Sequence, residues 1–303
     1  MMRILMPVLL FFAFLAPARA EGTLRWKLKK GQTLHYRTTQ RQISSYEFVD
    51  GKTELFDMTT TLDITLRVRN VDSAGVAEVE KSVDRVVQYR MERGEDRAFD
   101  SNLEGDQGVG KRMAQLLRAR VGVPVIVTMD PRGEIRQITL SQEALEAYRN
   151  AMVRPIPAQG ADRDVINAAS IVQSPPIWLP EGDVAVGDSW KFVTKLKNPR
   201  DPNGDLDRIT SFRYEGTEDG LARIAGEAKF KRINGKLEPA SMGSGLIRFD
   251  TSAGVLRDVE TKGSFKFPEV PLIGESVSTT ELHFRSELIS SDVRSEPNEG
   301  KKP

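Results

Sequence analysis

The sequence contains no cysteine, and after Leu15 it has no apolar run that approaches the length of a membrane-spanning helix. The first absence excludes disulfides, thiolate metal sites, cysteine nucleophiles and a lipid anchor attached through a cysteine. A secreted chain of this size can be stable without disulfides because it can bury a substantial core. The second absence predicts that the mature chain has no stable membrane anchor.

The N-terminal segment 1–20 has the pattern of a secretory signal peptide. Arg3 supplies a positive start, residues 4–15 are continuously apolar, and Ala18 and Ala20 form the small-residue pattern of a cleavage site. As a helix the apolar run would be about 18 Å long, too short to cross a hydrocarbon core of about 30 Å. We therefore expect cleavage after Ala20 and a periplasmic or secreted mature protein.

Positive and negative charges are nearly balanced and are mixed along the chain. The formal net charge is +1, and it falls to −1 when Arg3 and Arg19 leave with the signal peptide. A nucleic-acid-binding protein would instead show a clustered basic face, so the sequence predicts no nucleic-acid partner. Segment 290–303 is polar with a single aliphatic residue and is predicted to be a disordered tail.

Apolar and polar residues alternate through most of the chain, and residues 56–69 show this pattern most clearly. One parity is apolar except at Thr60 and consists of Phe56, Met58, Leu62, Ile64, Leu66 and Val68. A strand places the two parities on opposite faces, whereas a helix would scatter them around its circumference. The pattern therefore predicts an antiparallel sheet with one apolar face and one face in water.

Turn signals connect the alternating segments into consecutive hairpins. Asp50-Gly51 follows a predicted strand over 33–48, and residues 71–75 lead into another strand. The apolar parity of that strand is predicted to be Ala77, Val79, Val83, Val87, Tyr89 and Met91. The simplest topology for such hairpins is a meander.

Hairpins are also predicted in the second half of the chain. Segments 123–129 and 134–138 flank Asp130-Pro131-Arg132-Gly133, which has the composition of a turn. Strands resume from Ser189, and Asn203-Gly204 and Asn234-Gly235 are further turn signals.

The middle of the chain changes to helical spacing. Met113, Leu116 and Leu117 predict a short amphipathic helix, and further helices are predicted to begin near Ser141 and Asp162. Pro175-Pro176 ends this region.

Two pairs of segments recur in the same order, which predicts an internal duplication. Residues 31–36 match 187–192 in type, and 125–136 parallel 246–257. The predicted fold is β-rich α+β: a large curved antiparallel sheet of two related β halves, with about three short helices covering its apolar face. The predicted divisions are a signal peptide 1–20, an N-terminal β half 21–140 with one short helix, a helical segment 141–177, a C-terminal β half 178–289 and the tail 290–303.

Several short motifs resemble a family of uncharacterised secreted bacterial β-rich proteins. They are Val186-Gly187-Asp188-Ser189-Trp190, the preceding Leu179-Pro180, Phe99-Asp100-Ser101, and Phe249-Asp250 followed by Gly254-Val255-Leu256. The resemblance implies the architecture but supplies no activity and no site residues. Members are often lipoproteins, and this chain differs by lacking the anchor cysteine. The architecture is also similar, more distantly, to periplasmic half-barrel carriers of lipids and lipoproteins.

The sequence predicts no catalytic residue and no cofactor. His35 and His283 are predicted on the polar faces of strands, and no serine has the nucleophile-elbow pattern of a hydrolase. A weak calcium candidate is the acidic segment with oxygen ligands at alternate positions, Asp201, Asn203, Asp205 and Asp207. It departs from an EF-hand loop in its glycine position, and Phe212 stands where a bidentate Glu is required.

The sequence leaves two main function classes open, because a helix cover can either fill the apolar face or leave a cavity. With a packed core, the protein is a non-enzymatic structural or interaction module of the cell envelope, whose partner is an envelope protein. With a cavity, it is a periplasmic carrier or sensor for an apolar small molecule such as a lipid or an acylated ligand. The cavity candidates are Leu62, Ile64, Leu66 and Met113. A hydrolase is the third and least supported class.

Overall fold

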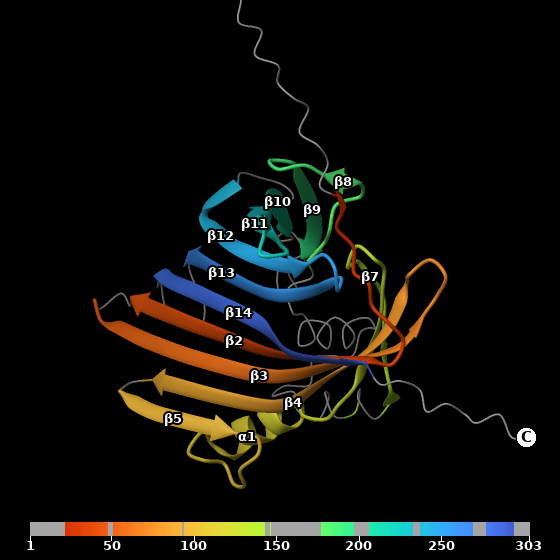
Figure 1. The fold of residues 1–303 in the computed structure, drawn as a ribbon. Coiled ribbons are helices and arrows are strands. Elements are labelled where there is room, and N and C mark those ends of the chain that lie inside the picture. The colour runs from red at the N-terminus through yellow and green to blue at the C-terminus, as the bar shows by residue number, and fades with distance from the viewer. Residues whose placement is uncertain are drawn as a thin grey trace, which may run out of the picture.

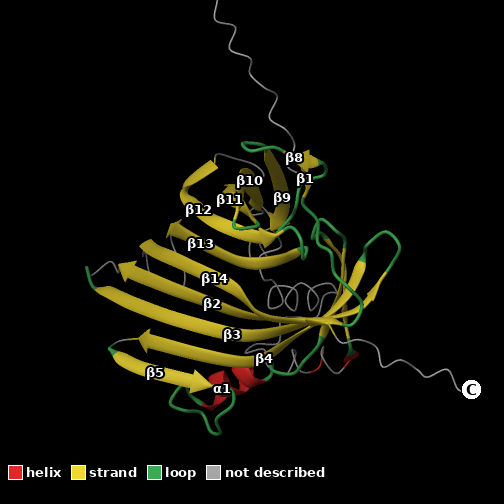
Figure 2. Cartoon of the chain, viewed as in Figure 1, coloured by secondary structure: helices red, strands yellow, loops and turns green. Residues whose placement is uncertain are grey.

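The protein is built on a large antiparallel sheet that is strongly curved (Figure 1). The computed structural model describes residues 22–47, 51–92, 94–142, 146, 177–196, 206–232, 237–268 and 277–293. Strands make up most of these residues, as Figure 2 shows. The β-rich antiparallel architecture predicted from the alternation is confirmed.

Strands from the first half of the chain form one side of the large sheet. Their order is β7-β6-β4-β3-β2, and β5 pairs with β4 beside β6. Their bounds are β2 Gln32–Glu47, β3 Thr53–Val71, β4 Ala77–Glu92, β5 Glu95–Asp100, β6 Val125–Met129 and β7 Ile135–Leu140.

Strands from the second half continue the same sheet, because β14 pairs antiparallel with β2 over nearly its whole length. From β14 the order continues as β13-β12-β11-β10-β9, so each strand lies beside the strand that precedes it in the sequence. The bounds are β9 Ser189–Leu196, β10 Leu206–Glu218, β11 Leu221–Arg232, β12 Leu237–Asp250, β13 Val255–Pro268 and β14 Val277–Val293. A separate two-stranded sheet joins β1 (Gly22–Thr23) to β8 (Asp183–Val184).

The two-faced strand predicted over 56–69 is confirmed as part of β3. Ile64 and Val68 are buried, and on the opposite face Asp57 and Asp63 form ion pairs with arginines of β2. The structure therefore places the apolar parity on the concave face of the sheet and the polar parity on the outer face.

The parity predicted for β4 is wrong beyond Val83. The register between β3 and β4 shifts at Asp63/Ile64, so Val86 and Gln88 are buried while Tyr89 is 42% exposed. A bulge inserts an extra residue into one strand and exchanges the faces that follow it. The sequence carries a sign of this shift, since Asp84-Arg85 and Val86-Val87 each place two residues of one kind in succession, but a change of face needs the pairing with β3 to be recognised.

Three helices were predicted, and the structure has one among its described residues, α1 (Lys111–Arg118). It begins after Gly110, whose φ of 87° favours glycine, and buries Ala114 and Leu117 against the sheet. The helices predicted over 141–152 and 162–172 lie almost entirely outside the described residues. Figure 2 shows α1 below β4 and β5, so it covers only one end of the concave face.

The first residues of the tail predicted over 290–303 belong to a strand, and residues 294–303 lie outside the described residues. β14 continues to Val293, because Ser290, Ser291 and Asp292 pair with the first residues of β2. Polar composition suggested disorder, but backbone pairing with a neighbouring strand is independent of side-chain polarity.

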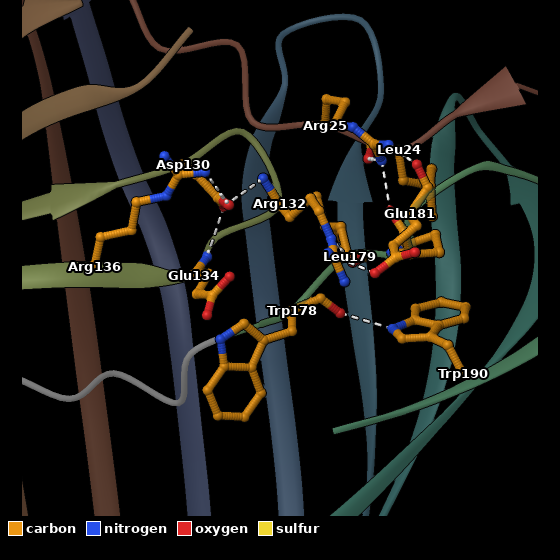
Figure 3. Close-up of polar contacts among 11 residues, drawn as sticks. Leu24, Arg25, Asp130, Arg132, Glu134, Arg136, Trp178, Leu179, Glu181 and Trp190 are labelled. Atoms are coloured by element: carbon orange, nitrogen blue, oxygen red, sulfur yellow. Dashed lines mark hydrogen bonds and ion pairs between the residues drawn. The ribbon is translucent and has the colours of Figure 1, made fainter. Parts of the chain in front are cut away.

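Segment 177–181, which we call the strap, ties the two edges of the sheet together (Figure 3). Leu179 donates its N–H to the Arg132 carbonyl oxygen at 2.8 Å, in the turn between β6 and β7. On the opposite edge, Trp190 of β9 donates its Nε1–H to the Trp178 carbonyl oxygen at 2.7 Å. Arg25 Nη1 donates to the Pro180 carbonyl oxygen at 2.6 Å, so the N-terminal segment is held at the same point. These contacts join the turn between β6 and β7, the N-terminal segment and β9 through the strap.

Candidate functional site

The concave face carries two adjoining cavities, which together form the candidate site. One of about 350 Å³ lies over β10–β14, and the other of about 360 Å³ lies over β2–β4 and α1. Gln40 of β2 and Phe284 of β14 line both cavities. Each volume is within the usual range for a small-molecule site.

Glycines shape the first cavity, which we call the glycine-floored cavity. Gly226 of β11 faces Gly245 of β12, and Gly243 of β12 faces Gly263 of β13. At Gly243 the missing side chain leaves room in the cavity, whereas a Cβ atom at Gly245 would collide with the Glu260 carbonyl oxygen of β13, so that glycine allows a close approach of the two backbones. The apolar part of the lining is Ile177, Phe212, Ala228, Ile247, Val259, Leu282 and Phe284.

The second cavity, which we call the helix-side cavity, is partly polar. Its floor includes Thr38, Thr60 and Gln88, and Gln88 donates from Nε2 to Thr60 Oγ1 at 3.2 Å. Further along the same face, buried hydroxyl pairs join β2 to β14: Thr38 with Ser286 at 2.9 Å and Ser44 with Thr280 at 3.0 Å. The concave face is therefore apolar near the strap and increasingly polar away from it.

Two polar residues of β10 line the glycine-floored cavity without a hydrogen-bond partner among the described residues. Thr210 is 8% exposed, and its Oγ1 makes no hydrogen bond. Arg208, two residues away on the same face, has an unpartnered buried Nε. Burial lowers the pKa of Arg208 from its usual value.

A third, smaller cavity of about 90 Å³ is enclosed by apolar side chains near the strap, among them Leu34, Tyr36, Leu256 and Ile177. Lys81 of β4 lines it and is 4% exposed. Burial lowers the pKa of this amine to about 7. Tyr36 donates its hydroxyl to the Leu256 carbonyl oxygen at 3.0 Å, and burial raises its pKa.

The four cavity candidates from the sequence all line concave cavities. Leu62, Ile64 and Met113 line the helix-side cavity, and Leu66 lines the smaller one. Whether any of them contacts a ligand stays a prediction.

The remaining candidates do not come together in the described part of the chain. Asp201, Asn203 and Asp205 lie outside the described residues, while Asp207 lies in β10. No cluster of three His, Asp or Glu side chains that could hold a metal occurs among the described residues. His35 Nδ1 is 2.9 Å from Thr65 Oγ1, and His283 is exposed on a different strand.

Sequence reasoning missed Arg208, Thr210 and the glycine floor, although a signal for each exists. Arg208 and Thr210 share the parity of Phe212 and Tyr214, so a charged residue on an inward parity could have been noticed. The glycines of predicted strands could have been interpreted as close-approach positions. Only the register, however, shows that they adjoin across three strands.

The motif 186–190 has a structural explanation. Gly187, with φ of 94°, donates its N–H to the Tyr214 carbonyl oxygen at 2.8 Å, and Asp188 Oδ2 accepts from the Ala185 N–H at 2.8 Å. These bonds form the turn into β9 and pair it with β10.

Comparisons with known proteins show the fold alone. No family model matches the chain, and no curated protein matches its sequence, so the family resemblance of the motifs is not shown. A lipovitellin structure that describes lipid–protein interactions is similar over 90% of this chain at 11% identity, with a TM-score of 0.52. This chain spans about a quarter of that protein, 26% of its length.

Two bacterial structures are less similar. A putative exported protein with a YmcC-like fold from Bacteroides fragilis has 10% identity and a TM-score of 0.28, covering 89% of this chain and 99% of that one. A β-barrel-like protein with a domain of unknown function from Brucella abortus has 8% identity and a TM-score of 0.31, covering 86% and 98%. In the described part of this chain, no helix is long and apolar enough to cross a membrane.

Proposed function

We propose that the protein is a non-enzymatic periplasmic or secreted carrier or sensor that binds the acyl chain of a lipid or of an acylated ligand on its concave face. The observation that carries this proposal is the pair of adjoining cavities, which share Gln40 and Phe284 and lie on the concave face of the curved sheet. Apolar lining with a few polar groups is the usual composition of a small-molecule site.

The likeness in fold to lipovitellin supports the same proposal, since that protein's structure describes lipid–protein interactions. Fold likeness alone does not establish function, so the cavities carry the argument. They favour a carrier over a structural module, which would require a fully packed core. They also lie apart from the two histidines of the chain, which gives no support to a serine hydrolase.

Filling the glycine-floored cavity is expected to weaken binding of a fluorescent fatty-acid probe. A Cβ atom at Gly243 would meet the Lys262 carbonyl oxygen at 3.4 Å and Gly263 at 3.7 Å, so a side chain can enter the cavity with little disturbance. Gly243→Val should weaken saturable probe binding at least about tenfold, the loss of roughly 1.4 kcal/mol of contacts. Its thermal stability should be unchanged or higher, because valine favours strands.

Ser264→Val on β13 is the matched control, because Ser264 is exposed and does not line the cavity. It should bind the probe as the wild type does. Absence of saturable binding by the wild-type protein, or equal binding by Gly243→Val, would contradict the proposed carrier function.

A further inference from the structure

We infer that the glycine-floored cavity recognises an anionic amphiphile, with Arg208 and Thr210 of β10 holding the oxygens of its head group. This inference rests on the proposed function and adds to it the charge of the ligand and the place of its polar end. A carboxylate and a phosphate share the required chemistry: negatively charged oxygens that accept hydrogen bonds.

Thr210 supplies the first observation. It is 8% exposed and lines the cavity, yet its Oγ1 has no partner among the described residues. Burying a hydroxyl without a hydrogen bond is costly, and native proteins rarely leave one unpaired. A ligand oxygen in the cavity would complete this bond.

Arg208 supplies the second observation. A guanidinium has five N–H donors in a planar fork that suits a carboxylate or phosphate. Arg208 lies on the same face of the strand as Thr210, about 7 Å away along the backbone, since alternate residues share a face. Burial lowers the pKa of Arg208, and no carboxylate of the described residues lies close enough to raise it. The buried side of the cavity therefore carries a positive charge that lacks a counter-ion within the described protein.

The other charged residues of the lining are already paired. Glu227 forms an ion pair with Lys229 at 3.1 Å, and Lys262 forms one with Glu260 at 3.1 Å. Successive side chains of a strand point to opposite faces. Because Gly226 and Thr261 face the cavity, their neighbours Glu227 and Lys262 are on the outer face. Neither residue competes for the head group or neutralises Arg208.

The rest of the cavity suits an acyl chain. From Thr210 and Phe212 of β10 the lining continues over the glycine floor to Leu282 and Phe284 of β14, and Phe284 also lines the helix-side cavity. A ligand with its head group at Arg208 would direct its chain along the concave face toward β2 and β3. The two cavities would then hold one amphiphile end to end.

Calorimetric titration of the full mature protein with oleate, oleyl alcohol and oleoyl lysophosphatidate, each below its aggregation concentration, tests this inference. The wild type is expected to bind the anionic ligands about ten- to a hundredfold more tightly than the alcohol, since a hydrogen bond to a charged group contributes about that factor. The ratio of oleate to lysophosphatidate affinity then assigns the carboxylate or the phosphate.

Variants identify the residues. Arg208→Met is expected to bind oleate and oleyl alcohol equally, and Arg208→Lys to retain part of the preference. Thr210→Val should weaken oleate binding several-fold while raising the melting temperature of the free protein, because it removes an unpaired buried hydroxyl. A purely structural role would lower binding and stability together. Arg213→Met, on the outer face of the same strand, should change neither.

The two proposals fail in different ways. If the wild type binds none of the three ligands, the carrier function itself is wrong. If it binds oleyl alcohol as tightly as oleate, or if Arg208→Met keeps the preference for oleate, the carrier function stands and the anionic head-group site is overturned.

Discussion

Replacing Asp130 with alanine is expected to lower the free energy of unfolding by about 3 kcal/mol. Asp130 is 5% exposed, and its Oδ1 accepts the N–H groups of Arg132 at 2.9 Å and Glu134 at 3.0 Å. Its Oδ2 accepts from Arg136 at 3.2 Å. Removing the carboxylate breaks three hydrogen bonds in a partly buried turn, and an unpaired donor that water does not reach costs about 1–3 kcal/mol. Urea unfolding followed by circular dichroism measures the loss.

The effect should extend beyond the turn itself. The turn that Asp130 organises presents the carbonyl oxygens of Pro131 and Arg132, which accept the N–H groups of Trp26 and Leu179, both at 2.8 Å. Gly133 has φ of 87°, and a Cβ atom there would collide with the Ile177 carbonyl oxygen and the Trp26 ring. We therefore expect Asp130→Ala also to weaken probe binding, because the strap positions Ile177 at the cavities.

Asp72 provides the matched control. Its Oδ1 accepts the N–H groups of Ala74 at 2.9 Å and Val76 at 2.8 Å, the same turn geometry, but the residue is exposed and contacts no strap. Asp72→Ala should cost about 1 kcal/mol, because water can satisfy the freed donors. Equal losses for the two variants would show that the strap does not depend on Asp130.

Stability is expected to rise by roughly 2–3 kcal/mol between pH 7 and pH 9 because of Lys81. Burial lowers its pKa to about 7 in the folded protein, whereas in the unfolded chain it stays near 10.4. In this window the unfolded state binds the proton and the folded state does not, so the free energy of unfolding increases with pH by up to about 1.4 kcal/mol per unit. The burial cost of the amine is fully present below pH 7.

Lys81→Met should remove most of this pH dependence, since methionine has a similar length and no charge. Urea midpoints at the two pH values for both proteins measure the difference. The window ends at pH 9 because the raised pKa of Tyr36 lowers stability at higher pH, where the unfolded tyrosine ionises first. A wild-type protein whose stability is the same at both pH values would contradict the burial of Lys81 as a neutral amine.

The strands could be predicted from the sequence because their pattern is local. Residues 56–69 alternate except at Thr60, and the hairpin around residues 130–133 has a turn composition that the structure confirms. The bulge in β4 depends on pairing with β3, and the break of alternation at Asp84-Arg85 does not by itself show a change of face, so the buried Val86 and Gln88 were assigned to the wrong face. The pairing of β2 with β14 is equally non-local.

The candidate site was predictable only in part for the same reason. Leu62, Ile64 and Met113 could be placed on apolar faces, and they do line a cavity. The glycine floor and the position of Thr210 beside it arise from register across several strands. The internal duplication and the division into 21–140, 141–177 and 178–289 stay predictions.

Nuclear magnetic resonance with a spin-labelled stearate tests most directly whether an acyl chain binds on the concave face. The spin label is placed near the end of the acyl chain and should broaden the amide signals of residues that line the cavities. Among these are Gly226, Gly243, Gly245 and Gly263. Reduction of the label with ascorbate should restore the signals. Outer-face exposed positions such as Ser264 and Arg285 should broaden less. Uniform broadening over the outer face, or none at saturating ligand, would contradict the account.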